Sequence, residues 1–189
     1  TPAMAASAEL AFKEASDSGS LLGGKYIKAM RGDSTCADSA AGTTAAQGLI
    51  DGGVVAIMGA DCSGVTTAIA DNAAIPNGVV MISPSATSPA LTSINDNGYF
   101  FRTAPSDARG GEILAKITKD RKVKSVAITY TNNDYGKGLA DVYESFVKSL
   151  GIKVTAVTAH EEGKADYGAE VATLALSLIH ISEPTRLAT

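Results

Sequence analysis

The chain has 189 residues, which is enough for one domain of ordinary size or for two small lobes. Its 16 basic and 20 acidic residues give a net charge of −4, and the basic residues are scattered, which argues against a nucleic-acid-binding surface. With 45% hydrophobic and 19% charged residues the composition is that of a globular protein, and no apolar run approaches the ~20 residues of a membrane-spanning helix. We therefore expect no nucleic-acid partner and no insertion into a membrane.

Helical and extended patterns alternate from the first residues onward. Apolar residues spaced three or four apart predict helices at residues 3–16, 39–51, 63–72, 108–120, 136–150 and 166–175. Short apolar or alternating runs predict strands at residues 25–30, 54–58, 79–83, 99–102, 125–130 and 153–159. Most of these strands are continuously apolar, as in a parallel sheet covered by helices on both faces. The predicted class is α/β, with a doubly wound parallel sheet.

Three loops follow predicted strands and lead towards predicted helices, at residues 59–64, 84–89 and 131–136. All three are rich in small and polar residues. In open parallel sheets, ligands bind beyond the carboxyl ends of the strands, where loop hydroxyls and backbone N–H groups can hold an anion at the positive end of a helix. These loops are the places where we expect a ligand to bind.

Residues typical of an active site are scarce. The sequence has no G-x-S-x-G, H-E-x-x-H, paired C-x-x-C or G-x-G-x-x-G motif, so a hydrolase, a zinc site and a dinucleotide site are unsupported. His160 is interpreted as a solvated loop residue at a strand end, and the tripeptide Arg31-Gly32-Asp33 as a turn. We expect no catalytic residue, no metal and no cofactor.

The two cysteines, Cys36 and Cys62, both precede predicted helices at the same edge of neighbouring βα units. Loops at one edge of a sheet can bring two Cα atoms within the ~4.4–6.8 Å that a disulfide requires. A disulfide would place the protein outside the cytoplasm, whereas two buried thiols would not. The spacing alone leaves both alternatives open.

Several motifs occur together in one order along the chain. They are Asp61-Cys62-Ser63-Gly64, Ser83-Pro84-Ser85-Ala86-Thr87-Ser88-Pro89, Phe101-Arg102-Thr103-Ala104, Asn133-Asp134-Tyr135-Gly136-Lys137-Gly138 and Asp166-Tyr167. This ordered set resembles the leucine/isoleucine/valine-binding proteins of ATP-binding cassette (ABC) importers, which have the type I periplasmic binding fold. The resemblance covers about residues 3–175.

The resemblance implies two doubly wound lobes that close on an amino acid. Residues 1–103 would be the first lobe without its first strand, and residues 104–175 the start of the second lobe. Residues 176–186 match the translation of a transposase-type DNA sequencing adapter; the alternative is an amphipathic helix that ends at Pro184. We therefore expect residues 176–189, with His180, to lie outside the native fold.

The resemblance also implies the residues of a ligand site and a disulfide. Ser63 would bind the ligand α-carboxylate, assisted by the N–H of Thr87, while the Ser85 carbonyl and the Thr87 hydroxyl would accept from the α-ammonium. Tyr135 would stack over the ligand, and the remaining ligand residues of the second lobe would lie beyond residue 175. Some family members carry a disulfide at the places of Cys36 and Cys62, which favours the paired alternative.

The function implied is that of a non-catalytic periplasmic protein that captures a branched-chain or related amino acid. We expect a monomer that delivers this ligand to the membrane permease of an ABC importer, with no signal peptide in the present sequence. Two alternatives stay open: a receptor or regulator domain of the same fold that senses an amino acid or amide, and an enzyme of the flavodoxin-like or Rossmann kind.

Overall fold

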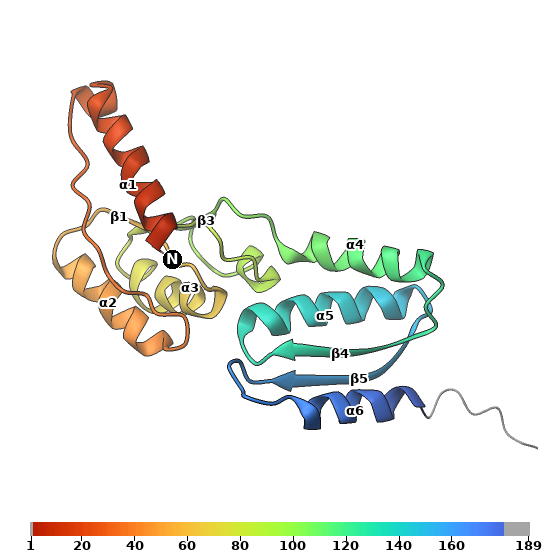
Figure 1. Ribbon diagram of the computed structural model, residues 1–189. Coiled ribbons are helices and arrows are strands. Elements are labelled where there is room, and N and C mark those ends of the chain that lie inside the picture. Colours follow the sequence, from red (N-terminus) through yellow and green to blue (C-terminus); the bar gives the residue numbers. More distant parts are fainter. Residues whose placement is uncertain (1, 180–189) are drawn as a thin grey trace, which may run out of the picture. The chain divides into compact units, whose positions relative to one another are not determined.

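The structure, a computed structural model, describes residues 2–179 (Figure 1). Most of the adapter-like segment, including His180, lies outside the described residues. The chain forms two compact units, one of residues 1–86 and 94–104 and the other of residues 87–93 and 105–189. Among the helices at residues 2–179, none has the length and apolar character needed to cross a membrane.

The first unit contains a three-stranded parallel sheet and the helices before and between its strands. The strands are β1 (Ala56–Met58), β2 (Val80–Ser83) and β3 (Phe100–Arg102), in the order β1-β2-β3. The helices are α1 (Pro2–Asp17), α2 (Ser39–Asp51) and α3 (Ser63–Ile69), the last continuing as a π-helical segment, Ala70–Ala74. A short 3-10 turn, Leu21–Gly23, follows α1.

Close packing of α2 on α3 forms part of the core of the first unit. Asp38 starts α2, because its side chain accepts a hydrogen bond from the Ala41 N–H at 2.9 Å. A Cβ at Gly42 would lie 2.6 Å from Val65 Cγ1, so only glycine lets the helices approach this closely. Val65 of α3 and Met81 of the central strand, β2, are both buried.

The strand predicted at residues 25–30 is wrong, because this segment has no regular secondary structure. The described residues pair no strand with it, and it is held to α1 instead. The Ile27 N–H donates to Ser16 Oγ at 3.0 Å, and Arg31 forms a two-bonded ion pair with Glu9, both bonds at 2.6 Å. Tyr26 in this segment is 76% exposed.

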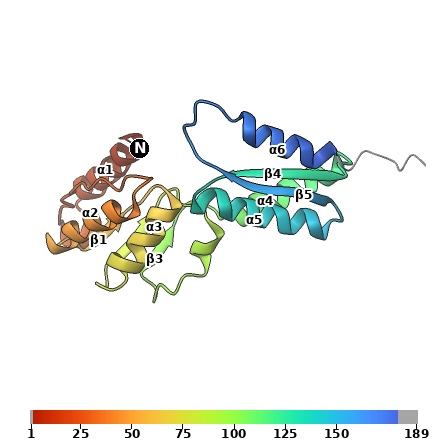
Figure 2. The same cartoon turned by 90° about the horizontal axis from the view of Figure 1, so that it is seen from below.

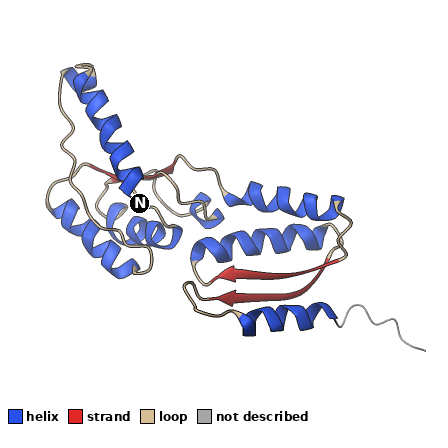
Figure 3. Cartoon of the chain, in the orientation of Figure 1, coloured by secondary structure: helices blue, strands red, loops and turns tan. Residues whose placement is uncertain are grey.

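The second unit consists of two parallel strands with helices on both faces (Figures 1 and 3). Strands β4 (Ser125–Thr131) and β5 (Lys153–His160) pair along their length, with one irregularity after Val126. Helix α5 (Asp134–Ser149) packs on one face of the two strands and α6 (Gly168–Ile179) on the other, as Figure 2 also shows, while α4 (Asp107–Asp120) packs on α5. A 3-10 turn, Pro89–Thr92, contacts α5.

The core of the second unit lies between the sheet and the α4–α5 pair. Ala115, Val147 and Ile152 are its buried centre, and Tyr143 packs beside them.

The helix predicted at 166–175 begins two residues later and ends at Ile179, so Leu176–Ile179 of the adapter-like segment are helical.

Candidate functional site

The loop after β1 leads into α3 and is tied down by a disulfide. Cys36 and Cys62 are joined, with their Cα atoms 5.4 Å apart, which confirms the predicted pairing. Ser63 is the first residue of α3 and is only 2% exposed. The disulfide therefore fixes the backbone immediately before Ser63 to the irregular segment that contains Cys36.

The loop after β2 lies beside the loop after β1, because the two strands are parallel neighbours in register. The buried Ser83 hydroxyl donates to the Ala60 carbonyl at 2.6 Å and accepts from the Ala86 N–H at 3.0 Å. The Ser85 hydroxyl donates to a carboxylate oxygen of Asp61 at 2.6 Å. The structure thus brings the Ser63 and Ser85 loops together at the carboxyl edge of the sheet of the first unit.

Thr87 belongs to the second unit and is paired with an acidic residue that the sequence analysis missed. Its hydroxyl donates to Asp107 Oδ2 at 2.6 Å, and the Asp107 N–H donates to the Thr87 carbonyl at 3.0 Å. Asp107 is the first residue of α4, after the N-cap Ser106, whose hydroxyl accepts from the Ala108 N–H. An acid that directly follows an N-cap serine is the signal that could have drawn attention to it, although such acids are common at helix starts.

Tyr135 lies in the first turn of α5 and is 47% exposed. Asn133 caps this helix, because its side-chain oxygen accepts from the Gly136 N–H at 2.8 Å. A Cβ at Gly136 would lie 2.3 Å from Thr131 Oγ1 and 2.4 Å from the Thr131 carbonyl oxygen. The position after Tyr135 therefore requires glycine. This close approach to Thr131, the last residue of β4, fixes where α5 begins and so where Tyr135 lies.

The loop after β5 is linked to the loop that carries Tyr135. Asn132 donates to the Glu161 carboxylate at 2.7 Å and Asn133 donates to the Glu162 carboxylate at 3.0 Å. Tyr167 closes the same loop, since its hydroxyl donates to the Glu161 carbonyl and accepts from the Lys164 N–H. The loop before Tyr135 is thus held by hydrogen bonds to the loop that follows the neighbouring strand, β5.

His160 is not the solvated loop residue that we expected. It is the last residue of β5, half-buried, with Nδ1 2.7 Å from Thr129 Oγ1 and its ring edge-on to Tyr167 at a centroid distance of 5.7 Å. Hydrogen bonding by Lys164 lowers the pKa of the neighbouring Glu170 carboxyl below its ordinary value.

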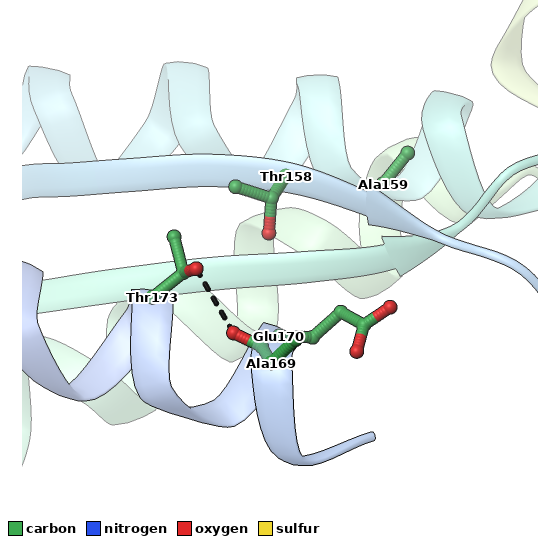
Figure 4. Close-up of a pocket in the computed structure, with 5 residues that line it drawn as sticks. All are labelled: Thr158, Ala159, Ala169, Glu170 and Thr173. Carbon is green, nitrogen blue, oxygen red and sulfur yellow. Dashed lines mark hydrogen bonds between the residues drawn. The ribbon is translucent and has the colours of Figure 1, made fainter. Parts of the chain in front are cut away.

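Two hollows flank α6 in the second unit, and neither contains a predicted ligand residue. One, of about 260 Å³, is lined by Thr158, Ala159, Ala169, Glu170 and Thr173 (Figure 4). The other, of about 250 Å³, is lined by Thr129, His160, Tyr167, Glu170, Val171 and Leu174. In the first, the Thr173 hydroxyl is used within the helix, donating to the Ala169 carbonyl, whereas the buried Thr158 hydroxyl has no hydrogen-bond partner among the described residues.

One cluster of potential metal ligands occurs in the described residues, formed by Cys36, Asp61 and Cys62. Both sulfurs belong to the disulfide, so neither can act as the thiolate that binds a metal. In this oxidised form the cluster is not a metal site.

Comparison with known proteins identifies the family. The model of the "Receptor family ligand binding region" matches residues 3–184. The chain belongs to this family. Leu/Ile/Val-binding protein BraC3 of Rhizobium johnstonii is 32% identical over 163 residues, covering 86% of this chain and 43% of the relative. A leucine-, isoleucine-, valine-, threonine- and alanine-binding protein of Pseudomonas aeruginosa is 31% identical over 156 residues, or 81% of this chain and 40% of the relative.

Solved structures support the same fold. An ABC transporter substrate-binding protein from Desulfitobacterium hafniense in complex with Leu has a TM-score of 0.68 at 28% identity, covering 92% of this chain and 50% of that one. A leucine-binding protein from Thermotoga maritima has a TM-score of 0.76 at 24% identity, covering 88% and 47%. These neighbours confirm the predicted resemblance and the type I periplasmic binding fold. The chain spans less than half the length of the curated relatives named above.

Proposed function

We propose that this chain is part of a non-catalytic solute-binding protein that captures a branched-chain or related amino acid outside the cytoplasm. Its partner would be the membrane permease of an ABC importer, to which it would deliver the amino acid as a monomer. The family membership and the Leu/Ile/Val-binding relatives support a solute-binding role. The disulfide is consistent with an oxidising compartment.

The observation that carries the proposal is the hydrogen bond from Thr87 to Asp107. A hydroxyl has one proton, and the proton of Thr87 is committed to the Asp107 carboxylate. The remaining lone pairs of the Thr87 oxygen can therefore only accept, and a negative charge lies directly behind them. This arrangement favours an ammonium group over a carboxylate at this position.

The other proposed contacts complete the recognition of an amino acid. The Ser63 hydroxyl and N–H, with the Thr87 N–H, would donate to the ligand α-carboxylate. The Ser85 carbonyl would accept from the ammonium. The Ser85 hydroxyl is not assigned to the ligand, because it already donates to Asp61. The exposed ring of Tyr135 would cover the ligand.

The test is an NMR titration of the 189-residue chain with L-leucine, because NMR detects affinities as weak as millimolar. S63A and T87V are expected to lower the affinity at least about ten-fold, since a hydrogen bond to a charged group contributes about 1.5–3 kcal/mol. S39A is the matched control for S63A, because Ser39 is also the first residue of a helix in the first unit. Unchanged affinity in S63A and T87V, or no leucine binding by the chain, would contradict the proposal.

The alternative function, a receptor or regulator domain, is supported by the description of the matching family model, "Receptor family ligand binding region". A sensor and a transport protein can hold the same ligand in the same way, so binding does not separate them. Uptake of labelled leucine by cells that lack the gene separates them: the transport protein predicts reduced uptake, and the sensor predicts unchanged uptake with an altered transcriptional or signalling response.

A further inference from the structure

One end of the second unit carries a concentration of positive charge. The residues of this basic face are Lys119, Arg121, Lys122, Lys124, Lys148 and Lys153. They come from the carboxyl ends of α4 and α5 and the amino ends of β4 and β5, which lie at the same end of the unit (Figure 1). The Lys153 N–H donates to the Lys124 carbonyl at 3.0 Å, so the starts of the two strands are in direct contact.

The charges of the basic face are largely uncompensated. Lys148 pairs with Glu144 at 2.6 Å, whereas the other five basic side chains are exposed and form no ion pair within the described part of the chain. Asp120 is the one acidic residue in the run from residue 119 to residue 124. The whole chain has a net charge of −4, so this positive end opposes the overall charge.

Helix dipoles explain only part of this pattern. Cations are favourable in the last turn of a helix, which accounts for Lys119, Arg121 and Lys148. Lys122, Lys124 and Lys153 lie beyond the helices, in the turn after α4 and at the strand starts, where no dipole favours them. Acidic residues of the unit gather instead at its opposite end, with Asp107 at the start of α4 and the Glu161-Glu162 pair after β5.

The composition of the basic face indicates the kind of partner. Lysines predominate, and a lysine ammonium acts as a point charge without the fork geometry by which arginine recognises one planar group. The exposed apolar neighbours are aliphatic, Ile117 at 42% and Val123 at 37%, and neither described hollow is lined by a residue of this face. Lysines mixed with aliphatic side chains on an open surface fit a broad anionic layer with an apolar interior.

We propose that the basic face docks on a membrane surface rich in anionic lipid headgroups. This docking goes beyond the proposed capture of an amino acid. In the second unit, Thr87, Asp107 and Tyr135 precede or begin helices at the opposite end from the basic face, so docking leaves them accessible.

The test is co-sedimentation of the 189-residue chain with vesicles of phosphatidylglycerol and phosphatidylcholine, compared with phosphatidylcholine alone. We expect binding only to the anionic vesicles, weakening as salt rises above physiological strength. Each lysine near an anionic surface contributes roughly five-fold to the partition coefficient, so K124Q/K153Q should reduce binding roughly 25-fold. Both side chains are exposed, so circular dichroism should show an unchanged fold.

Two variants control for charge. K124R/K153R keeps the charge and should bind like the unchanged chain, and K25Q/K28Q removes two exposed lysines of the first unit and should also bind normally. Equal binding to both kinds of vesicle, or an equal loss in K25Q/K28Q, would overturn the proposal. Binding of polyglutamate in preference to anionic vesicles would also overturn it and would assign the face to an acidic protein.

Discussion

Removal of the disulfide should destabilise the first unit and leave the second unchanged. The Cys36–Cys62 bond closes a loop with a sequence separation of 26 residues. The chain-entropy relation for a loop of this length gives about 3.5 kcal/mol of stabilisation at 25 °C. This is a large share of the 5–15 kcal/mol that a typical domain has, so C36S/C62S should shift the urea midpoint of the first unit downward by roughly 1–3 M.

Hydrogen exchange read by mass spectrometry can resolve this effect by unit. In C36S/C62S we expect faster exchange around Val65 and Met81, the buried residues of the first unit, and unchanged exchange around Val147 in the second. Reductant should convert the unchanged chain to the same behaviour, because Cys36 is exposed, and should have no effect on the variant. Equal loss of protection in both units, or none in either, would refute the reasoning.

Two further predictions concern the second unit. G136A should destabilise the second unit by about 1–3 kcal/mol in urea unfolding, because the added Cβ meets backbone atoms that cannot move aside. The control is G110A, where a Cβ meets nothing within 4 Å, and it should instead stabilise α4 by about 0.5–1 kcal/mol. A loss of stability in both variants would indicate a general intolerance of these helices and would contradict the prediction. Hydrogen bonds from Lys116 and then Arg109 lower the pKa of the Glu112 carboxyl below its ordinary value near 4.5, so the stability from this cluster is fully present above that value and is lost as pH falls through the lowered pKa. K116M should reduce the drop in urea midpoint between pH 6 and pH 3, and an unchanged drop would show that the cluster does not contribute.

Local pattern was sufficient wherever an element is stabilised by its own residues and its nearest neighbours. The helix expected at 39–51 is Ser39–Asp51, because the cap at Asp38 and the glycines after residue 51 bound it locally. The strands expected at 125–130 and 153–159 each gain one residue at the carboxyl end. The polar loops after the strands were likewise evident from the sequence, because each follows a strand that is recognisable by itself.

Elements that depend on a distant partner were not predictable in this way. The alternating segment 25–30 has the composition of a strand, but a strand exists only when another strand pairs with it, and none does so among the described residues. His160 looked like a loop residue because the sequence does not show that Thr129 and Tyr167 lie beside it.

The sequence by itself determined the α/β class, the family resemblance and the loops expected to bind a ligand, since these depend on local periodicity and on motifs in one order. Only the tertiary structure decided that Asp107 accepts the Thr87 hydroxyl across 20 positions, and that the lysines of two helix ends and two strand starts form one face. The physical reason is that hydrogen bonds and electrostatic fields depend on distance in space, and parallel strands joined by helices bring together residues that are far apart along the chain.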